Sequence, residues 1–310
     1  MDGNGSKIEI FKPFGEAVEL TKKILFQPFD FTKWLVIGFA AFLCGHFSAV
    51  GFNFPFGGFP QHRKTNPELI SPDWEQWKPW LLIAIVVFVV VMLVLIVVLT
   101  WLRARANFIF TDCIVRNRGA IAEPWREYRK EGNSYFLFLL LVALGSLAIL
   151  GIFGLCFFLG FGAFGQHSSS SGMTSVLIIF LVLILIAWIC FAFFFGVTSY
   201  FMIPVMYVRR CRAVDAFREV AGLVLENVGL FILFCLFEIC LILGIGMIGG
   251  IATYLTCCLA ALPYVGTVIL LPVFVCLRAF GLCFIRQFGP DYDVWARIAP
   301  TASEPPPLPS

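Results

Sequence analysis

Two ionisable residues, Glu238 and Arg278, stand inside long apolar runs. Glu238 lies nine residues after Gly229, where its run begins, which places it about 14 Å along a helix. Arg278 precedes Arg286 by eight residues, a depth of about 12 Å on the next run. An ionisable side chain at such depth in a membrane is costly unless it is paired. The sequence therefore predicts a buried ion pair between Glu238 and Arg278.

This ion pair has two interpretations. A proton or ion relay would belong to a transporter or channel, whereas a structural clasp would hold two neighbouring helices together. The clasp is favoured, because one pair without further intramembrane acids is little for a relay. Pro204 and Pro272 predict kinks in the fourth and sixth apolar runs, because proline removes a backbone hydrogen bond. Such kinks can hinge a gate, but the favoured interpretation is a passive bend.

Recognisable catalytic and metal-binding patterns are missing from the sequence. Residues 244–249 spell G-x-G-x-x-G, but a dinucleotide site needs a preceding strand in a soluble βαβ unit, so close helix packing is the better explanation. HExxH, GxSxG and P-loop motifs do not occur. The histidines, His46, His62 and His167, lack the spacing of metal ligands. We predict a protein that is not an enzyme and uses no cofactor and no metal.

The composition is that of an integral membrane protein. Of the 310 residues 60% are hydrophobic and 13% are charged, and the mean hydropathy is +0.92. A soluble domain is about half apolar and about a quarter charged. The net charge of +3 is too small to indicate a nucleic-acid partner. Eleven cysteines, an odd number that lies mostly in apolar runs, do not indicate a disulfide framework.

Six apolar runs reach the roughly 20 residues that a helix needs to cross a bilayer. They are continuous rather than alternating, which indicates helices and not a barrel. The runs are Phe31–Phe52, Pro79–Leu102, Tyr135–Phe164, Val176–Val208, Gly229–Ala260 and Tyr264–Ile285. We expect an all-α bundle of six membrane helices over residues 31–287. A cytoplasmic segment with an interfacial helix precedes it over residues 1–30, and a disordered cytoplasmic tail follows over residues 288–310.

The basic residues predict how the bundle is oriented. Nineteen Lys and Arg fall on the side of the two termini, and three, Arg63, Lys64 and Lys78, fall on the other side. Basic residues collect on the cytoplasmic side of membrane proteins. We therefore expect a multi-pass protein with both termini in the cytoplasm, placed in a bacterial inner membrane.

A short pattern occurs three times, each time before an odd-numbered run. It consists of a small residue or proline, an aromatic residue, any residue and a glutamate, and we call it the glutamate motif. Its aromatic and acidic members are Phe14 and Glu16, Trp125 and Glu127, and Phe217 and Glu219. Each motif opens an amphipathic stretch, which is typical of a helix in the membrane interface, although any loop beside a membrane tends to look amphipathic. The pattern predicts three parallel repeats of two spans each.

Three short stretches carry a resemblance to a known group. They are residues 12–17 (KPFGEA), residues 28–35 (PFDF…WL) and residues 278–290, from Arg278-Ala279-Phe280 to Arg286-Gln287-Phe288-Gly289-Pro290. Over residues 10–292 the chain resembles uncharacterised bacterial polytopic membrane proteins, which are similar to the membrane-anchor domain of glycerophosphodiester phosphodiesterases. The resemblance does not extend to the phosphodiesterase activity, because the chain has no room for the catalytic barrel and lacks its acidic ligands.

These observations predict an accessory or scaffold protein that acts through contacts with a membrane-protein partner or an anionic lipid. The basis is the shortage of polar groups inside the apolar runs. The alternative is a small transporter or channel that uses Glu238 and Arg278 within the membrane, with hinges at Pro204 and Pro272.

Overall fold

The computed structural model describes residues 9–45, 74–165, 171–255 and 263–296. Within these ranges every regular element is a helix, which confirms the all-helical class. In chain order the elements are α1 (Phe11–Phe26), α2 (Phe31–Leu43), α3 (Trp74–Val115), α4 (Ala122–Glu127), α5 (Arg129–Gly165), α6 (Ser171–Arg209), α7 (Ala213–Glu226), α8 (Val228–Leu255), α9 (Pro263–Ile269), α10 (Leu271–Arg286) and the short 3₁₀ helix η3 (Pro290–Tyr292).

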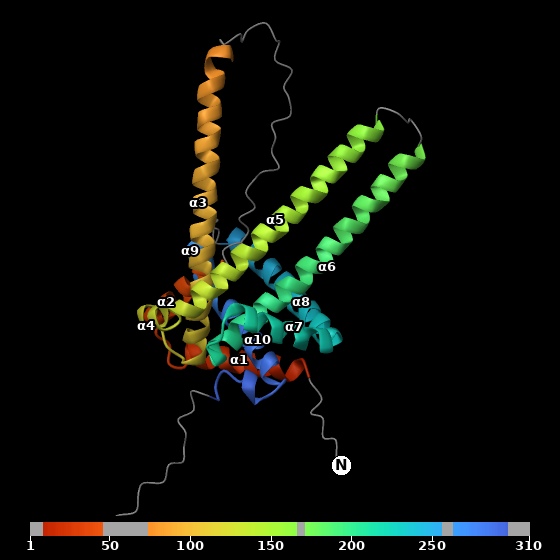
Figure 1. The fold of residues 1–310 in the computed structure, drawn as a ribbon. Coiled ribbons are helices and arrows are strands. Elements are labelled where there is room, and N and C mark those ends of the chain that lie inside the picture. Colours follow the sequence, from red (N-terminus) through yellow and green to blue (C-terminus); the bar gives the residue numbers. More distant parts are fainter. Residues whose placement is uncertain (1–8, 46–73, 166–170, 256–262, 297–310) are drawn as a thin grey trace, which may run out of the picture.

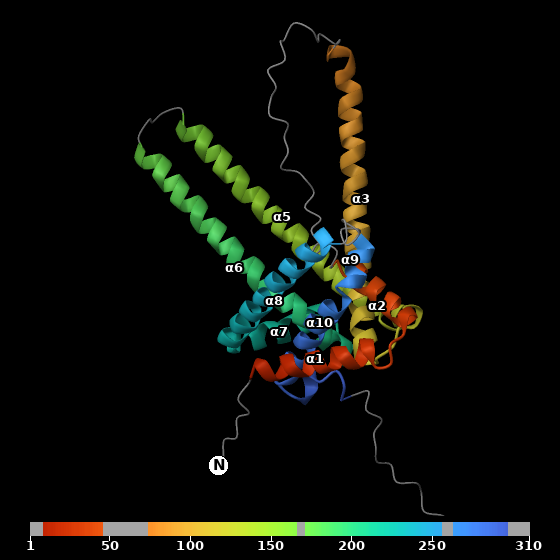
Figure 2. The ribbon, with the colours of Figure 1, turned by 180° about the vertical axis from the view of Figure 1, so that it is seen from behind.

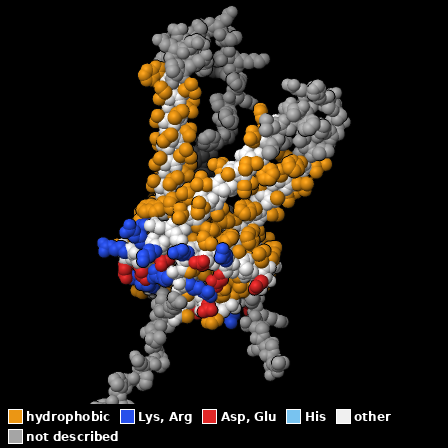
Figure 3. Space-filling view, viewed as in Figure 1, with side chains coloured by type: hydrophobic (Ala, Val, Ile, Leu, Met, Phe, Trp, Pro, Cys, Tyr) orange, Lys and Arg blue, Asp and Glu red, His pale blue; other side chains and the backbone are white. Residues whose placement is uncertain are grey.

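Long apolar helices rise from a compact base that carries the charges (Figures 1 and 2). The base is formed by α1, α4, α7 and α10 together with the lower ends of α3, α5 and α6, and we call it the charged base. Lys, Arg, Asp and Glu side chains gather there, whereas the projecting helices are covered with apolar side chains (Figure 3). The largest fully buried side chains include eight phenylalanines: Phe108, Phe110, Phe201, Phe231, Phe234, Phe274, Phe280 and Phe284.

Four helices are long and apolar enough to cross a membrane, so the chain is a membrane protein. They cover Trp80–Val115, Arg129–Leu155, Ile179–Arg209 and Val228–Met247. They correspond to the second, third, fourth and fifth runs expected from the sequence. Helix α3 extends well beyond the expected end at Leu102, because the polar residues Arg103 to Asn107 interrupt the hydropathy but not the helix.

The other two expected spans differ from the prediction. The run Phe31–Phe52 is helical over α2, and the rest of it from residue 46 lies outside the described residues. The 13 residues of α2 reach about 20 Å, which is short of the roughly 30 Å of a bilayer core. The run Tyr264–Ile285 is divided at Leu270 into α9 and α10.

Pro272 explains the division of the last run. It has no N–H group to donate to the carbonyl of Val268, four residues earlier. The indole Nε1 of Trp34 donates to that carbonyl oxygen instead, at 3.0 Å. The kink expected at Pro272 is therefore an interruption of the helix at Leu270, which α2 stabilises from the side. Pro204, in contrast, lies inside α6, which continues through it as one helix.

The residues after α10 differ from the disordered tail that the sequence suggested. Residues 288–296 pack against the charged base, while those from 297 lie outside the described part. Val294 is 1% exposed, and the Phe288 ring stacks on Phe231 of α8 with centroids 5.5 Å apart. Residues 288–296 are therefore an ordered part of the charged base.

Helices α1 and α7 are amphipathic, as expected, but their apolar faces pack against protein. In α1 the buried face includes Ala17 and Ile24, and it lies on α10. In α7 it includes Ala216 and Val220, and it lies on α6. These helices are thus parts of the base.

We predict that Trp34→Phe lowers the midpoint of thermal unfolding in detergent micelles. The substitution leaves the Val268 carbonyl without a donor, which costs about 1 kcal/mol for a hydrogen bond of this kind. Trp188→Phe is the matched control, because the described contacts of Trp188 include only a ring contact with Phe191. An equal effect of both substitutions would contradict this explanation of the break.

Candidate functional site

The three motif glutamates have the same role in the charged base. Each pairs with an arginine at the end of a long helix or of α10. The pairs are Glu16 with Arg286, Glu127 with Arg116 (2.9 Å, Oε1 to Nη2) and Glu219 with Arg209 (2.9 Å, Oε1 to Nη2). Each pair therefore joins a short helix that begins near the motif to the end of a helix that leads into the apolar region.

The order of these pairs around the base is cyclic. Helix α4 packs on α3, and α7 packs on α6, so each of these short helices lies against the long helix that precedes it. No helix precedes α1 in the described chain, and α1 packs on α10 from the other end. The Glu16–Arg286 pair, 270 residues apart in sequence, closes the ring.

The other members of the glutamate motif also have matching positions. The residues that open the three motifs, Pro13, Pro124 and Ala216, are buried. The aromatic residues that follow pack against rings of the apolar helices: Phe14 against Phe237 (5.3 Å between centroids), Trp125 against Trp101 (5.7 Å) and Phe217 against Phe138 (5.2 Å). The motif thus combines a buried anchor, a ring contact and an ion pair.

Asp112 is the most deeply buried acid of the charged base. Its side chain is fully buried near the end of α3. The hydroxyl of Tyr207 donates to Oδ1 at 2.9 Å, and Arg118 donates to Oδ2 from Nε at 3.1 Å and from Nη2 at 3.0 Å. Arg116 Nε lies 3.1 Å from Oδ1. Both carboxylate oxygens are therefore satisfied, which offsets the cost of burying the charge.

A stack of rings continues from Asp112 toward α6 and α7. The Tyr207 and Tyr128 rings are stacked with centroids 4.7 Å apart, and the Arg210 guanidinium carbon lies 3.8 Å from the Tyr128 centroid. Arg210 also pairs with Glu127, and its Nη1 lies 3.5 Å from Oε1 of Glu131. Because Arg210 holds a left-handed backbone conformation (φ 54°), these contacts stabilise a costly turn between α6 and α7.

Burial and charge act in opposite directions on the groups of this network. Burial lowers the pKa of the Arg116 guanidinium, but the carboxylates of Asp112 and Glu127 outweigh it, so the pKa is raised overall. Burial raises the pKa of the Tyr128 hydroxyl. At neutral pH the arginine thus stays charged and the tyrosine stays neutral, which suits a stable network better than proton transfer.

Arg105 occupies a second polar site, formed largely by rings. Its guanidinium carbon lies 4.5 Å from the Trp101 centroid and 4.9 Å from the Trp125 centroid, and its Nη2 donates to Asn133 Oδ1 at 2.8 Å. Gly132 permits this approach, because a Cβ atom there would lie 2.9 Å from Arg105 Cγ. The motif residue Trp125 therefore stabilises a buried cation.

The predicted Glu238–Arg278 pair is not formed. Across the described residues no direct ion pair joins them, and Arg278 instead donates to Thr111 Oγ1 from Nε (3.2 Å) and Nη2 (2.9 Å). Its guanidinium carbon lies 5.4 Å from the Tyr200 ring centroid. Arg278 is 6% exposed and links α10 to α3 and α6. The predicted clasp between the fifth and sixth runs is therefore wrong in its partner, because the rotation of α10 about its axis turns Arg278 toward Thr111 of α3.

Sequence reasoning missed Asp112, Tyr128, Tyr207 and Arg105. Asp112 carried a signal, because an acid followed four residues later by arginine lies on one helix face. The hydropathy obscures this signal, because it places the end of the span at Leu102, ten residues before Asp112. Among the described residues, no group of three or more His, Cys, Asp or Glu could hold a metal ion.

These features define a helical membrane protein with a cross-braced charged base. A family model described as a family of unknown function, DUF7544, matches residues 9–290, and the chain belongs to this family. No curated protein and no solved structure matches the chain. The match covers nearly the residues of the expected resemblance, whereas the likeness to phosphodiesterase anchors stays a prediction.

We predict that Asp112→Asn strongly destabilises the charged base. Removing the charge leaves Arg116 and Arg118 without their buried partner, and breaking a buried pair costs about 3 kcal/mol or more. Asp291→Asn is the control, because that carboxylate is 80% exposed beside Arg209. The measurement is the thermal unfolding midpoint in micelles, and similar midpoints for both variants would argue against Asp112 as a structural centre.

A charge exchange tests the closing pair of the ring. Glu16→Arg should lower the unfolding midpoint by repulsion from Arg286, and adding Arg286→Glu should restore most of the loss. A partly exposed pair is worth about 1 kcal/mol or less, so the recovery in the double variant is the decisive quantity. Glu19→Arg on the same helix is the control, because it makes the same change of charge at an exposed position. Absence of recovery would rule out a direct pair.

Proposed function

We propose that the protein is a non-enzymatic accessory or scaffold protein that acts in the plane of the membrane, through contacts with another membrane protein or with lipid. The observation that carries the proposal is the exposure of the apolar helices above the charged base. Every residue from Trp80 to Leu99 of α3 is exposed on all faces of the helix. The most apolar windows of α3, α5 and α6 contain no buried residue.

The exposed faces of these helices must pack against lipid or another protein, because the described part of this chain does not cover them. A transporter or channel usually packs its helices around a central pathway, whereas the upper part of α3 stands apart from α5 and α6, which it meets near the charged base (Figures 1 and 2). Apolar side chains cover the visible faces of these helices (Figure 3). The bilayer covers them by default, and a partner helix can replace lipid wherever it packs better.

The charged base supports a role as a platform. Asp112, Glu127 and Glu219 are all engaged by arginines, and Arg278 joins three helices. A polar network that is satisfied in this way favours rigidity over chemical reactivity. The alternative, a transporter that uses Glu238 and Arg278, loses support because these two side chains do not pair.

The finer organisation belongs to the same proposal. The cyclic pairing of the glutamate motifs favours three parallel units, each made of a short helix and two spans, for six spans in all. In this reading α2 and the divided α9–α10 run are the shorter spans of the first and third units. The bias of basic residues toward one side favours cytoplasmic termini and, with the resemblance to bacterial proteins, an inner membrane.

A photocrosslinking experiment in intact membranes tests the proposal. A benzophenone amino acid at Val90 of α3 or Ile186 of α6, both exposed, should give a discrete adduct with one identified protein or with lipid. The same group at Ile109, which is 1% exposed, should crosslink only within the chain. Solute flux in liposomes that is lost in Glu238→Gln, without loss of folding, would instead support the transporter.

A further inference from the structure

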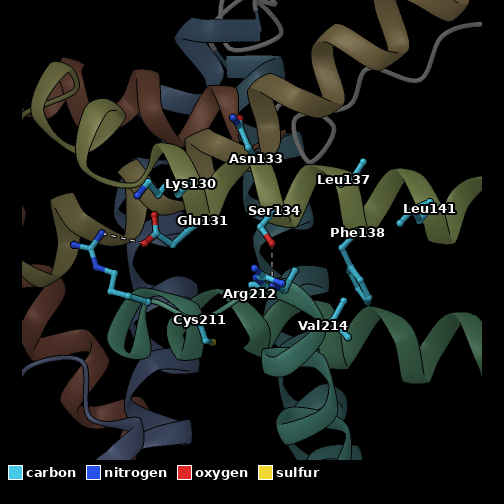
Figure 4. Close-up of a pocket in the computed structure, with 12 residues that line it drawn as sticks. Lys130, Glu131, Asn133, Ser134, Leu137, Phe138, Leu141, Cys211, Arg212 and Val214 are labelled. Carbon is cyan, nitrogen blue, oxygen red and sulfur yellow. Dashed lines mark hydrogen bonds and ion pairs between the residues drawn. The ribbon is translucent and has the colours of Figure 1, made fainter.

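A groove of about 610 Å³ lies between the start of α5 and the junction of α6 and α7 (Figure 4). One face of α5 forms its length, because the lining residues recur at helical spacing. In order from the charged base they are Lys130, Asn133, Ser134, Leu137, Phe138 and Leu141. The lining therefore changes from cationic, through polar, to apolar over about 16 Å of helix.

The opposite wall of the groove is the turn that leads into α7. It contains Arg210, Cys211, Arg212 and Ala213. The Ala213 N–H donates to Ser134 Oγ at 3.1 Å, which ties this wall to α5. Arg212 is the N-cap residue of α7 and provides no side-chain cap for the helix. A cation at this end opposes the helix dipole, so a bound anion would improve the electrostatics of the turn.

The groove contains two basic residues that have no acidic partner in the described part of the chain. Arg209 and Arg210 of the same basic stretch are both engaged by acids. Lys130 and Arg212 have no ion pair with any residue of the described ranges, and both are exposed. The charges available to a ligand thus lie at the polar end of the groove, and apolar side chains form the other end.

Glu131 supplies an independent sign of a ligand. It lines the groove, is 9% exposed, and its Oε1 lies 3.5 Å from Arg210 Nη1. Its Oε2 is buried without a hydrogen-bond partner, a condition shared in the described chain only with Ser199 Oγ. A buried acceptor without a donor is costly. A ligand that brings a hydroxyl group would satisfy it.

We propose that this groove binds one anionic glycerophospholipid whose head group carries hydroxyl groups, such as phosphatidylglycerol. The phosphate lies between Lys130 and Arg212, a head-group hydroxyl donates to Glu131, and an acyl chain follows Leu137 and Leu141. The order of charge, polarity and apolar surface along α5 is the order of these parts in a lipid. The site would be the lipid contact of the proposed function. This inference rests on the proposed function, because it needs the groove to face the membrane surface.

Lipid retention by the full-length protein tests this site. The protein is purified in dodecyl maltoside, mixed micelles are made with phosphatidylglycerol or phosphatidylcholine, and bound lipid is counted by native mass spectrometry. The double variant Lys130→Gln/Arg212→Gln should bind phosphatidylglycerol about 25-fold more weakly, since each basic residue contributes about 1 kcal/mol near anionic lipid and 1.4 kcal/mol is tenfold. Arg126→Gln/Arg218→Gln makes the same change of charge outside the groove and should retain the lipid.

Cys211 gives a second measurement at the groove itself. Phosphatidylglycerol should slow its alkylation by N-ethylmaleimide in the parent protein, measured on the Cys211 peptide, while the rate at Cys276, which lies outside the groove, stays constant. Leu141→Trp, which fills the apolar end but keeps both cations, should remove this protection.

Three outcomes would overturn the lipid site. They are equal retention by the two double variants, equal protection by phosphatidylcholine, and protection that persists in Leu141→Trp. If the adducts from Val90 or Ile186 persist alongside such results, the proposed function stands and only the lipid site fails.

Discussion

The structure depends on one electrostatic constraint, which is that arginines at the ends of apolar helices need partners before those helices enter the membrane. The glutamate motif meets this need three times, through Glu16, Glu127 and Glu219. Asp112 meets it once more in full burial. A charge left unpaired at that depth would cost far more than the single partly exposed pairs contribute. The short helices of the base are therefore required by the arginines that they neutralise.

Once the charged base is cross-braced, the apolar helices need little contact with each other. The bilayer provides the same apolar surroundings as a protein core, so no hydrophobic force draws α3 toward α5 and α6. The stable part of the molecule is thus the base, where rings and ion pairs interlock. The packing of the projecting helices can change with the lipid or protein around them. The proposed partner contacts are therefore on these helices.

The same pairing gives meaning to the cations that have no partner. In a surface rich in lysine and arginine, free charges alone would indicate only topology. Arg116, Arg118, Arg209 and Arg210 are engaged by acids, whereas other exposed basic residues such as Arg126 and Arg218 have no ion pair within the described ranges. Lys130 and Arg212 differ from those because both line one groove beside the unsatisfied oxygen of Glu131. The structure thereby distinguishes basic residues that stabilise the fold through ion pairs from basic residues that are available to bind a ligand.

The sequence by itself determined the helical membrane class, four of the six expected spans and the glutamate motif, because hydropathy and helix periodicity are local properties. It also singled out Arg278, which the structure buries within the protein. Only the tertiary structure decided that Arg278 meets Thr111, that Pro272 breaks its helix beside Trp34, and that Glu16 closes the base with Arg286. These contacts join segments more than 160 residues apart, and their choice depends on how the helices rotate and pack, which no local pattern encodes.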